Sequence, residues 1–197
     1  MRNEAREQQE RVLEMRRRVQ GAEHPDTLTA MSNLALTLSQ QGERDAAREQ
    51  LERVLEVSRR VLGEAHPTTL VAMNNLAETL RAQGNLQGAR EQQERALAMT
   101  RQTLGEFHPD TFQSMHNLAS IYLAQGEMEG AKGLQMRALE GARQVLGNEH
   151  PNTLTVMENL ADILRQLGDA ISAETLRKEA EEIRQRQEAS PAPPRGQ

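Results

Sequence analysis

Apolar side chains recur along the chain at the spacing of one helical face. Between residues 21 and 62 a first helical run contains Leu28, Met31, Leu34, Ala35 and Leu38. A second run, from about Arg44 to Val61, places Ala47, Leu51, Val54, Leu55 and Ser58 on its inward face. No segment alternates polar and apolar residues as a half-buried strand does, so the pattern predicts helices throughout.

Residues that begin and end helices flank these two runs. Pro25 suits the first turn of a helix because it has no N–H to satisfy, and Asp26 and Thr27 are expected to bond the first-turn amides. Gly42 supplies the left-handed residue that commonly ends a helix, and Gly63 is expected to stop the second run. The segment is therefore predicted to form a helical hairpin.

The hairpin pattern returns every 42 residues along the chain. The recurring residues are His24-Pro25, His66-Pro67, His108-Pro109 and His150-Pro151; Gly21, Gly63, Gly105 and Gly147; Thr27, Thr69, Thr111 and Thr153; and Met31, Met73, Met115 and Met157. An Asn-Leu-Ala triplet recurs with them, beginning at Asn33, Asn75, Asn117 and Asn159. A hairpin cannot bury both of its apolar faces alone, so the hairpins are expected to stack into an all-α solenoid.

These residues resemble the tetratricopeptide repeat (TPR), whose pattern is matched by Leu34-Ala35, Leu38, Gly42, Ala47 and Val54-Leu55. The 42-residue period, Leu-Gly-x-x-His-Pro-x-Thr-Leu and Asn-Leu-Ala-x-x-Leu-x-x-Gln-Gly resemble the kinesin-light-chain-like variety, which has a longer second helix. The resemblance covers residues 1 to about 187 and implies a right-handed solenoid. We expect a partial repeat over 1–20, four repeats over 21–62, 63–104, 105–146 and 147–187, and a disordered Pro-rich tail over 188–197.

The two ends of the array are expected to differ. The first helix of the chain aligns with the second helices of the repeats and lacks a partner, which leaves Val12, Leu13, Met15 and Val19 open. This predicts either a fragment of a longer array or a homo-oligomer that forms through the N-terminal helix. The last helix has a thin apolar stripe and a charged outer side, which terminal repeats need.

Composition narrows the classes of partner. Of the 197 residues, 37% are hydrophobic and only 2% aromatic, so pockets built for flat ligands are not expected. The net charge of −5 argues against nucleic acid as a partner. There is no cysteine, no apolar run that could span a membrane and no signal-peptide pattern at the start. These features predict a cytoplasmic protein with no membrane contact.

The histidines are the first candidates for a functional site. His24, His66, His108 and His150 occupy equivalent positions of successive repeats, which spaces them along one edge and does not bring them to a point. We interpret them as turn residues that pack or hydrogen-bond between helices, and we expect no metal site. No nucleophile, acid and histidine form a recognisable set, and no Gly-rich loop could cradle a phosphate. We therefore expect neither enzyme activity nor a cofactor.

The asparagines are better candidates, because the helical pattern points them away from the apolar stripe. In the family that the chain resembles, asparagines at the positions of Asn33, Asn75, Asn117 and Asn159 line a concave groove and contact the main chain of a bound peptide. A carboxamide both donates and accepts, so it can pair with any backbone. The alternative is a structural ladder in which each asparagine bonds a neighbouring helix.

Other groove positions are expected to set specificity. They include Glu78, Arg81, His116, Asp162 and Arg165, with Glu158 beside them. The carboxylates predict a basic or neutral peptide, partly offset by the arginines. The sequence thus predicts a non-catalytic scaffold that binds a peptide or helical segment of another protein, or alternatively a structural segment of a larger assembly.

Several residues depart from the repeat pattern. Gln92-Gln93 lies near positions that are usually apolar, and Gly88, Gly130, Gly133 and Gly141 lie in or beside second helices. An interior glycine costs roughly 1 kcal/mol relative to alanine. The second and third repeats are therefore predicted to be softer than their first helices suggest.

Overall fold

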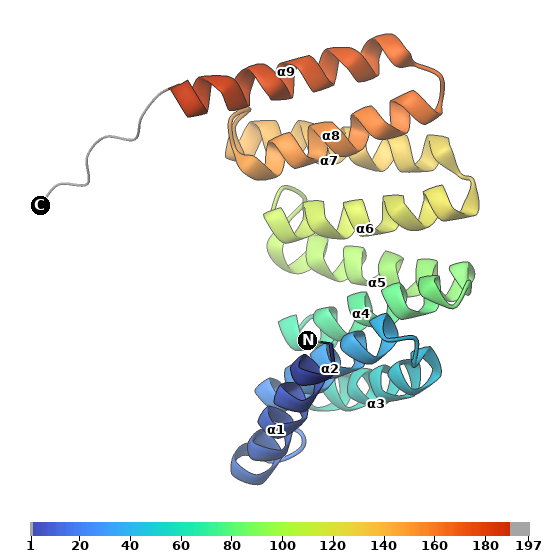
Figure 1. The fold of residues 1–197 in the computed structure, drawn as a ribbon, viewed down its shortest axis with the longest axis vertical. Coiled ribbons are helices and arrows are strands. Elements are labelled where there is room, and N and C mark those ends of the chain that lie inside the picture. The colour runs from blue at the N-terminus through green and yellow to red at the C-terminus, as the bar shows by residue number, and fades with distance from the viewer. Residues whose placement is uncertain (1, 190–197) are drawn as a thin grey trace, which may run out of the picture. The chain divides into compact units, whose positions relative to one another are not determined.

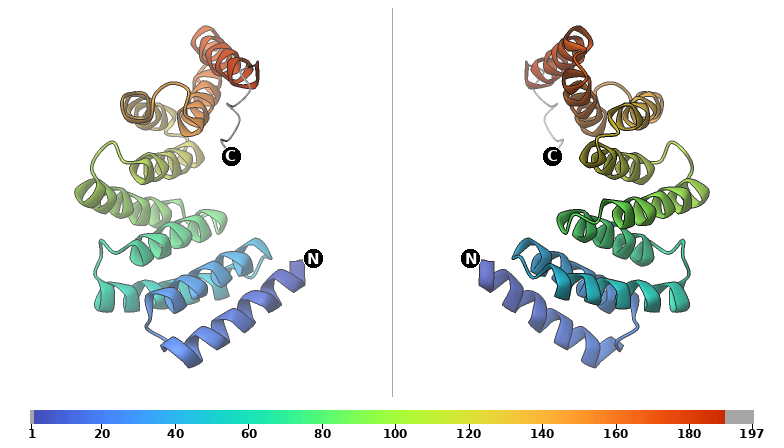
Figure 2. Two further views of the ribbon diagram at one scale, coloured as in Figure 1. Left: turned by 90° about the vertical axis from the view of Figure 1, so that its left-hand side faces the viewer. Right: turned by 90° about the vertical axis from the view of Figure 1, so that its right-hand side faces the viewer.

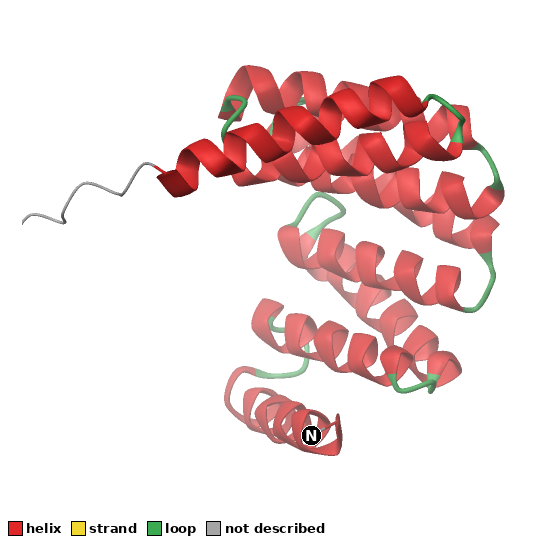
Figure 3. Cartoon of the chain, turned by 45° about the horizontal axis from the view of Figure 1, so that its top comes forward, coloured by secondary structure: helices red, strands yellow, loops and turns green. Residues whose placement is uncertain are grey.

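The computed structural model describes residues 2–189, with side chains from Arg6 onward, and these residues are helical apart from short turns (Figure 3). The helices of this part are α1 (Arg2–Gln20), α2 (Pro25–Gln40), α3 (Arg44–Leu62), α4 (Pro67–Ala82), α5 (Leu86–Leu104), α6 (Pro109–Gln125), α7 (Met128–Leu146), α8 (Pro151–Gln166) and α9 (Ala170–Ala189) (Figure 1). The prediction of an all-α fold is confirmed.

The helices are grouped in two units, Met1–Glu106 and Phe107–Gln197. In the first unit, α2 packs against α1, α3 and α4, and α4 packs against α3 and α5. In the second unit, α7 packs against α6 and α8, and α8 packs against α9. Within each unit, consecutive helices run antiparallel (Figure 2), and their stacking makes a helical-repeat solenoid.

The core of each unit is a ribbon of aliphatic side chains between helices. The inward face predicted for α3 is the buried one: Leu51 and Val54 have no exposed surface, and Leu55 is 4% exposed. The recurring methionines Met73 and Met115 are likewise fully buried. Removing a leucine or methionine side chain from water contributes about 1.5–3 kcal/mol, so this packing is the main stabilising term of each hairpin.

The recurring histidine caps the first helix of each repeat. The backbone N–H groups of Asp26, Thr68, Asp110 and Asn152 donate to Nδ1 of the histidine two residues earlier, at 3.1–3.2 Å. The proline that follows each histidine occupies the first turn. The interpretation of the histidines as hydrogen-bonding turn residues is confirmed. The prediction that Asp26 and Thr27 bond the first-turn amides is wrong, because the cap of α2 is His24.

The recurring threonine ties the start of a first helix to the end of the preceding second helix. Thr69 Oγ1 donates to the carbonyl of Gly63, and Thr153 Oγ1 donates to that of Gly147, each at 2.8 Å. Gly63 has φ +92, a left-handed conformation that favours glycine over residues with a side chain. At Gly63 and Gly147 the glycine, histidine and threonine therefore build one turn between hairpins, whereas the equivalent Thr27 Oγ1 is buried without a hydrogen-bond partner among the described residues.

Two glycines of the second unit make room for aromatic rings. A Cβ on Gly141 would lie 2.6 Å from Phe107 and 2.7 Å from Phe112, and one on Gly130 would lie 2.9 Å from Tyr122. By contrast, a Cβ on Gly133 would meet nothing within 4 Å. Gly130 and Gly141 thus have a packing role that offsets part of their helix propensity cost.

The ends of the described chain show two further features. α9 includes Glu188 and Ala189, which the sequence pattern places in the tail, and the remaining predicted tail, 190–197, lies outside the described residues. Of the helices in the described part, none has both the length and the apolar character that crossing a bilayer requires. The division into repeats at residues 21, 63, 105 and 147 stays a prediction.

Removing a histidine cap is expected to lower stability by the amount typical of a helix cap. His66→Ala leaves a first-turn N–H without its acceptor, and we expect the free energy of unfolding to fall by about 0.5–2 kcal/mol. His66→Asn, which keeps an acceptor at the cap, should retain most of it. Urea unfolding followed by circular dichroism measures both, and equal losses in the two variants would contradict the capping role.

Two of the three glycines inside α7, Gly133 and Gly141, are expected to respond oppositely to alanine. Gly141→Ala should lower the free energy of unfolding by about 1–3 kcal/mol, because the Cβ overlaps two phenylalanine rings. Gly133→Ala should raise it by about 0.5–1 kcal/mol, since the same helix gains propensity without a clash. Thermal and urea unfolding of the two variants measures both effects. Stabilisation by both substitutions would contradict the close packing of the phenylalanine rings against Gly141.

Candidate functional site

The first helices carry the predicted asparagines, and two of these bond the preceding first helix. In the first unit, Asn75 Nδ2 donates to the carbonyl of Ser32 at 3.4 Å. In the second unit, Asn159 Nδ2 lies 3.0 Å from His116 Nδ1. Both asparagines are half-buried. Each of these two asparagines thus bonds a neighbouring helix, as in the structural ladder that the sequence analysis gives as the alternative to peptide binding.

The other two asparagines make no such bond among the described residues. Asn33 is exposed and lines a groove between α1 and α2. Asn117 Oδ1 accepts a hydrogen bond of 2.9 Å from Gln113 Nε2, one turn earlier on the same helix. The row of asparagines therefore divides into two that link helices and two that do not.

Two buried glutamines join the polar contacts between helices, a role that the sequence pattern does not predict for them. Gln93 and Gln135 are each 1% exposed, on α5 and α7. Gln93 Nε2 donates to Asn74 Oδ1 at 3.0 Å, and Gln135 Nε2 lies 2.8 Å from His116 Nδ1. The 42-residue period contains a signal for these contacts. Gln93 and Gln135 occupy equivalent positions, and so do their partners Asn74 and His116.

His116 is the meeting point of these contacts in the second unit. Its Nδ1 faces the amide nitrogens of Gln135 and Asn159, and amide nitrogens only donate. Nδ1 is therefore the acceptor, and the ring proton is on Nε2. Burial lowers the pKa of His116 below its ordinary value, because desolvation disfavours the charged ring. The imidazole is thus held neutral and in one tautomer between three helices.

A cavity of 170 Å³ opens beside His116, between α6 and α8. Its lining residues are Pro109, Phe112, Gln113, His116, Asn152, Thr155, Val156 and Asn159. None of these side chains is charged at neutral pH, given the lowered pKa of the histidine. Gln113 and Asn152 are exposed, so their amides stand at the edge of the cavity. The arrangement offers neutral donors and acceptors around an apolar patch of phenylalanine, valine and proline.

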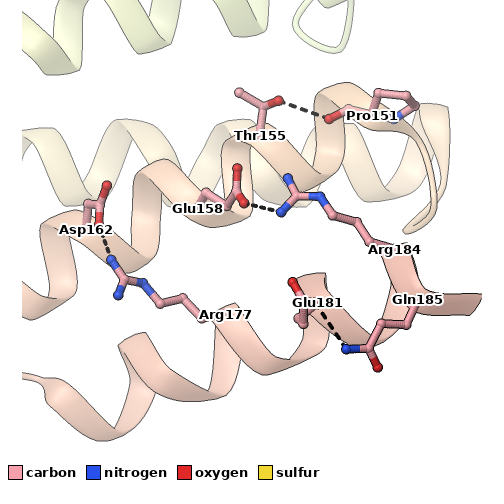
Figure 4. Close-up of polar contacts among 8 residues, drawn as sticks. All are labelled: Pro151, Thr155, Glu158, Asp162, Arg177, Glu181, Arg184 and Gln185. Carbon is pink, nitrogen blue, oxygen red and sulfur yellow. Dashed lines mark hydrogen bonds and ion pairs between the residues drawn. The ribbon is translucent and has the colours of Figure 1, made fainter. Parts of the chain in front are cut away.

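The predicted groove carboxylates are each paired with an arginine. Glu78 accepts two bonds from Arg81, at 2.7 and 3.0 Å. On α8, Glu158 pairs with Arg184 and Asp162 pairs with Arg177, both from α9 (Figure 4). These last two pairs border a hollow of 580 Å³ between α8 and α9 that carries both signs of charge.

The paired carboxylates change the expectation for a ligand. Because an arginine offsets each of them, the first helices do not present a net acidic surface. Arg165 is exposed on α8. In residues 6–189, no group of three or more histidine, aspartate or glutamate side chains is placed to hold a metal ion. The α6–α8 cavity therefore offers neutral hydrogen bonding, whereas the α8–α9 hollow offers both signs of charge.

The contacts of His116 predict a pH dependence of stability. Because the pKa of His116 is lower in the folded chain than in the unfolded one, the unfolded state binds more protons as pH falls below about 6.5. The free energy of unfolding should therefore fall with pH in that range and level off below the lowered pKa.

His116→Asn provides the comparison, since asparagine is the natural residue at the equivalent Asn74 and accepts from Gln93 there. At pH 7.5 the variant should lie within about 1 kcal/mol of the unaltered chain, since the hydrogen bond is retained. The free energy of unfolding should depend less on pH in the variant. The other four histidines are present in both proteins, so their contributions cancel in the comparison. Urea titrations from pH 7.5 to 5 measure this, and equal slopes would contradict the buried neutral histidine.

Known proteins share the repeat that builds these helices. A tetratricopeptide repeat model matches residues 68–140 and 110–186, and a second model of that repeat matches 2–26 and 27–68. None of the curated proteins matches the sequence. A crystal structure of the nearly identical TPR-like repeats of a Podosopora anserina putative kinesin light chain is similar, with 29% identity and a TM-score of 0.81. The match covers 96% of this chain and 89% of that one.

The structure of BtubC (BKLC) from P. vanneervenii shares the fold, with 23% identity and a TM-score of 0.79, over 100% of this chain and 78% of that one. The tetratricopeptide repeat in general is a non-catalytic scaffold for protein–protein interaction. The models together span residues 2–186, and the similar structures carry kinesin-light-chain repeats. The chain belongs to the tetratricopeptide repeat family and is of the kinesin-light-chain type.

Proposed function

We propose that the chain is a binding scaffold that holds an extended, uncharged segment of a partner protein against the α6–α8 face of the second unit. The observation that carries the proposal is the cavity beside His116, whose lining is uncharged and rich in carboxamides. An extended peptide exposes its own N–H and C=O groups, which need partners when they leave water. Carboxamides satisfy both kinds of group irrespective of the peptide's side chains.

Each part of the cavity has a role in this proposal. Gln113 and Asn152 stand exposed on opposite helices and would pair with the main chain of the segment. Pro109, which is partly exposed, would contact one apolar side chain of the segment, while the buried Phe112 and Val156 form the floor beneath it. Asn159 and His116 are already engaged with each other, so they position the face and keep it neutral. Asn117, which is bonded only to Gln113 among the described residues, extends the row of amides along α6.

The ion pairs of the first helices determine which charge we expect on the bound partner segment. An acidic groove would favour a basic peptide, as the sequence alone leads us to expect. However, Glu158 and Asp162 are occupied by arginines of α9. These pairs are partly exposed, and an exposed ion pair contributes little, so a charged peptide would gain little from meeting carboxylates that are already paired. We therefore propose a neutral segment in place of a basic one.

A second candidate is an assembly role through α1. Three apolar side chains of this helix are exposed: Val12 at 40%, Met15 at 58% and Val19 at 76%. The expectation that Leu13 is open as well is wrong, because Leu13 is only 6% exposed and belongs to the core. An apolar stripe of this kind on a helix surface marks an interaction site more often than an isolated exposed residue does.

A displayed library of unstructured peptides tests the first candidate. We expect neutral sequences to be selected by the unaltered chain, and Gln113→Ala with Asn152→Ala to weaken their binding by about 10-fold or more. Each lost hydrogen bond contributes about 0.5–1.5 kcal/mol. Both residues are exposed, so helicity should not change.

Gln144→Ala is the matched control, because Gln144 is an exposed glutamine on α7 outside the cavity lining. It should leave peptide affinity unchanged. Selection of no peptide, or equal affinity for the double variant and the control, would overturn the proposed site.

A further inference from the structure

A groove of 390 Å³ runs between α1 and α2 in the first unit. α1 contributes Gln8, Gln9, Val12 and Arg16 to its lining, and α2 contributes Thr29, Ala30 and Asn33. Arg16 is the single charged group in the lining, and it is paired with Asp26 at 3.6 Å. In Figure 2, α1 (blue) lies at one end of the first unit with α2 on one side only. The groove is thus mostly apolar and amide-lined.

The equivalent surface 42 residues later is covered by a helix. Val54 and Ala72, which correspond to Val12 and Ala30, have no exposed surface. Gln50 Nε2 donates to the carbonyl of Met31 at 2.8 Å, so it bonds the backbone of α2. Asn75 donates to the next carbonyl of α2, that of Ser32. A first helix therefore seals this surface by apolar contact and by two amide-to-backbone bonds.

The groove on α1 and α2 has the same groups without the covering helix. Gln8 and Asn33 correspond to Gln50 and Asn75, and their amides have no partner among the described residues. Gln9 Oε1 is buried and unpaired there as well. Val12 is 40% exposed where its equivalent is fully buried. The groove therefore presents amide donors that the backbone carbonyls of a helix could accept from. Its apolar floor could be covered by the side chains of that helix.

We propose that this groove binds an amphipathic α-helix of a partner protein, in the position that α2 takes against α3 and α4. The inference builds on the assembly role of α1 and is independent of the α6–α8 face. The repeat itself specifies the shape of the occupant. It is a helix whose contact side carries small and aliphatic residues, so that backbone carbonyls come within reach of Gln8 and Asn33.

The charges around the apolar stripe favour a partner helix over a second copy of this chain. Arg11 and Arg18 lie on one side of the stripe formed by Val12, Met15 and Val19, with Glu7 and Glu14 behind them. Over residues 6–20, α1 carries five arginines and three glutamates, so the helix is net positive. Two copies of α1 packed together would bring two positively charged helices into contact, and like charges at an interface repel. A helix with carboxylates at this edge would pair with the arginines.

The first repeat shows such a pairing within the chain. Arg60, the equivalent of Arg18, bonds Glu23 at 2.5 Å. Glu23 lies directly before the cap of α2, the helix that covers the equivalent groove. We therefore expect the bound helix to carry an acidic residue just before its first turn, opposite Arg18.

A peptide with the sequence of residues 22–41, held helical by a hydrocarbon staple between positions 33 and 37, is the probe. We expect it to bind the full chain saturably in fluorescence anisotropy. Val12→Glu should weaken binding by about 10-fold or more, because it buries an unpaired charge in the groove. The matched control is Val61→Glu, since Val61 is a valine of α3 that is 44% exposed and lies outside the groove.

A charge swap tests the acidic edge. Arg18→Glu should weaken the probe several-fold, and a probe that carries Glu23→Lys should recover affinity for that variant. No saturable binding of the probe, or equal weakening by Val12→Glu and Val61→Glu, would overturn the inference. A dimer of the unaltered chain that becomes monomeric with Val12→Glu in light scattering would also overturn it, since a second copy would then fill the groove. None of these substitutions lies on α6 or α8. If the stapled probe does not bind but the library-selected peptides still do, the groove between α1 and α2 is wrong and the proposed function stands.

Discussion

Every hairpin of this chain has apolar side chains on two sides and buries both only when another hairpin packs against it. In the first unit, α2 meets this condition through contacts with α1, α3 and α4, and Leu28 in its first turn is 1% exposed. Val12, which no helix of the described residues covers, is 40% exposed, while the equivalent Val54 has no exposed surface. The histidine caps and the Thr69–Gly63 bond form the turns between hairpins, so they define how one hairpin meets the next.

The polar groups between hairpins have a second consequence, for binding. Gln135 and Asn159 hold His116 in a neutral tautomer, so three helices of the second unit share one buried set of hydrogen bonds. Such a set fixes the side chains around it before a ligand arrives, which reduces the ordering cost of binding. The exposed amides of Gln113 and Asn152 therefore flank a rigid face. The proposed function rests on the same contacts that join the hairpins.

Periodicity is enough to predict the helices and the buried face of α3, because burial there repeats at helical spacing. It assigns the cap to the wrong residues, since Asp26 and Thr27 have stronger general preferences than His24 and only the backbone geometry shows which group accepts. The sequence predicts that Gln93 weakens the packing of its repeat, because a single polar residue in an apolar stripe gives no sign of its hydrogen-bond partner. Gln93 finds that partner 19 residues earlier, on another helix. The glycines are likewise ambiguous in the sequence, because nothing there shows that Gly141 lies beneath two rings.

The central claim is that the uncharged face between α6 and α8 binds the main chain of a partner segment. Side-chain amide signals in ¹⁵N-resolved NMR spectra of the full chain test it most directly, because Gln113, Asn152, Asn159 and Gln144 each give a separate NH₂ pair. On titration with a peptide selected by the chain, we predict shifts at Gln113 and Asn152, a smaller shift at Asn159 and none at Gln144. Shifts confined to amides outside the α6–α8 face, with Gln113 and Asn152 unmoved at saturation, would contradict the account.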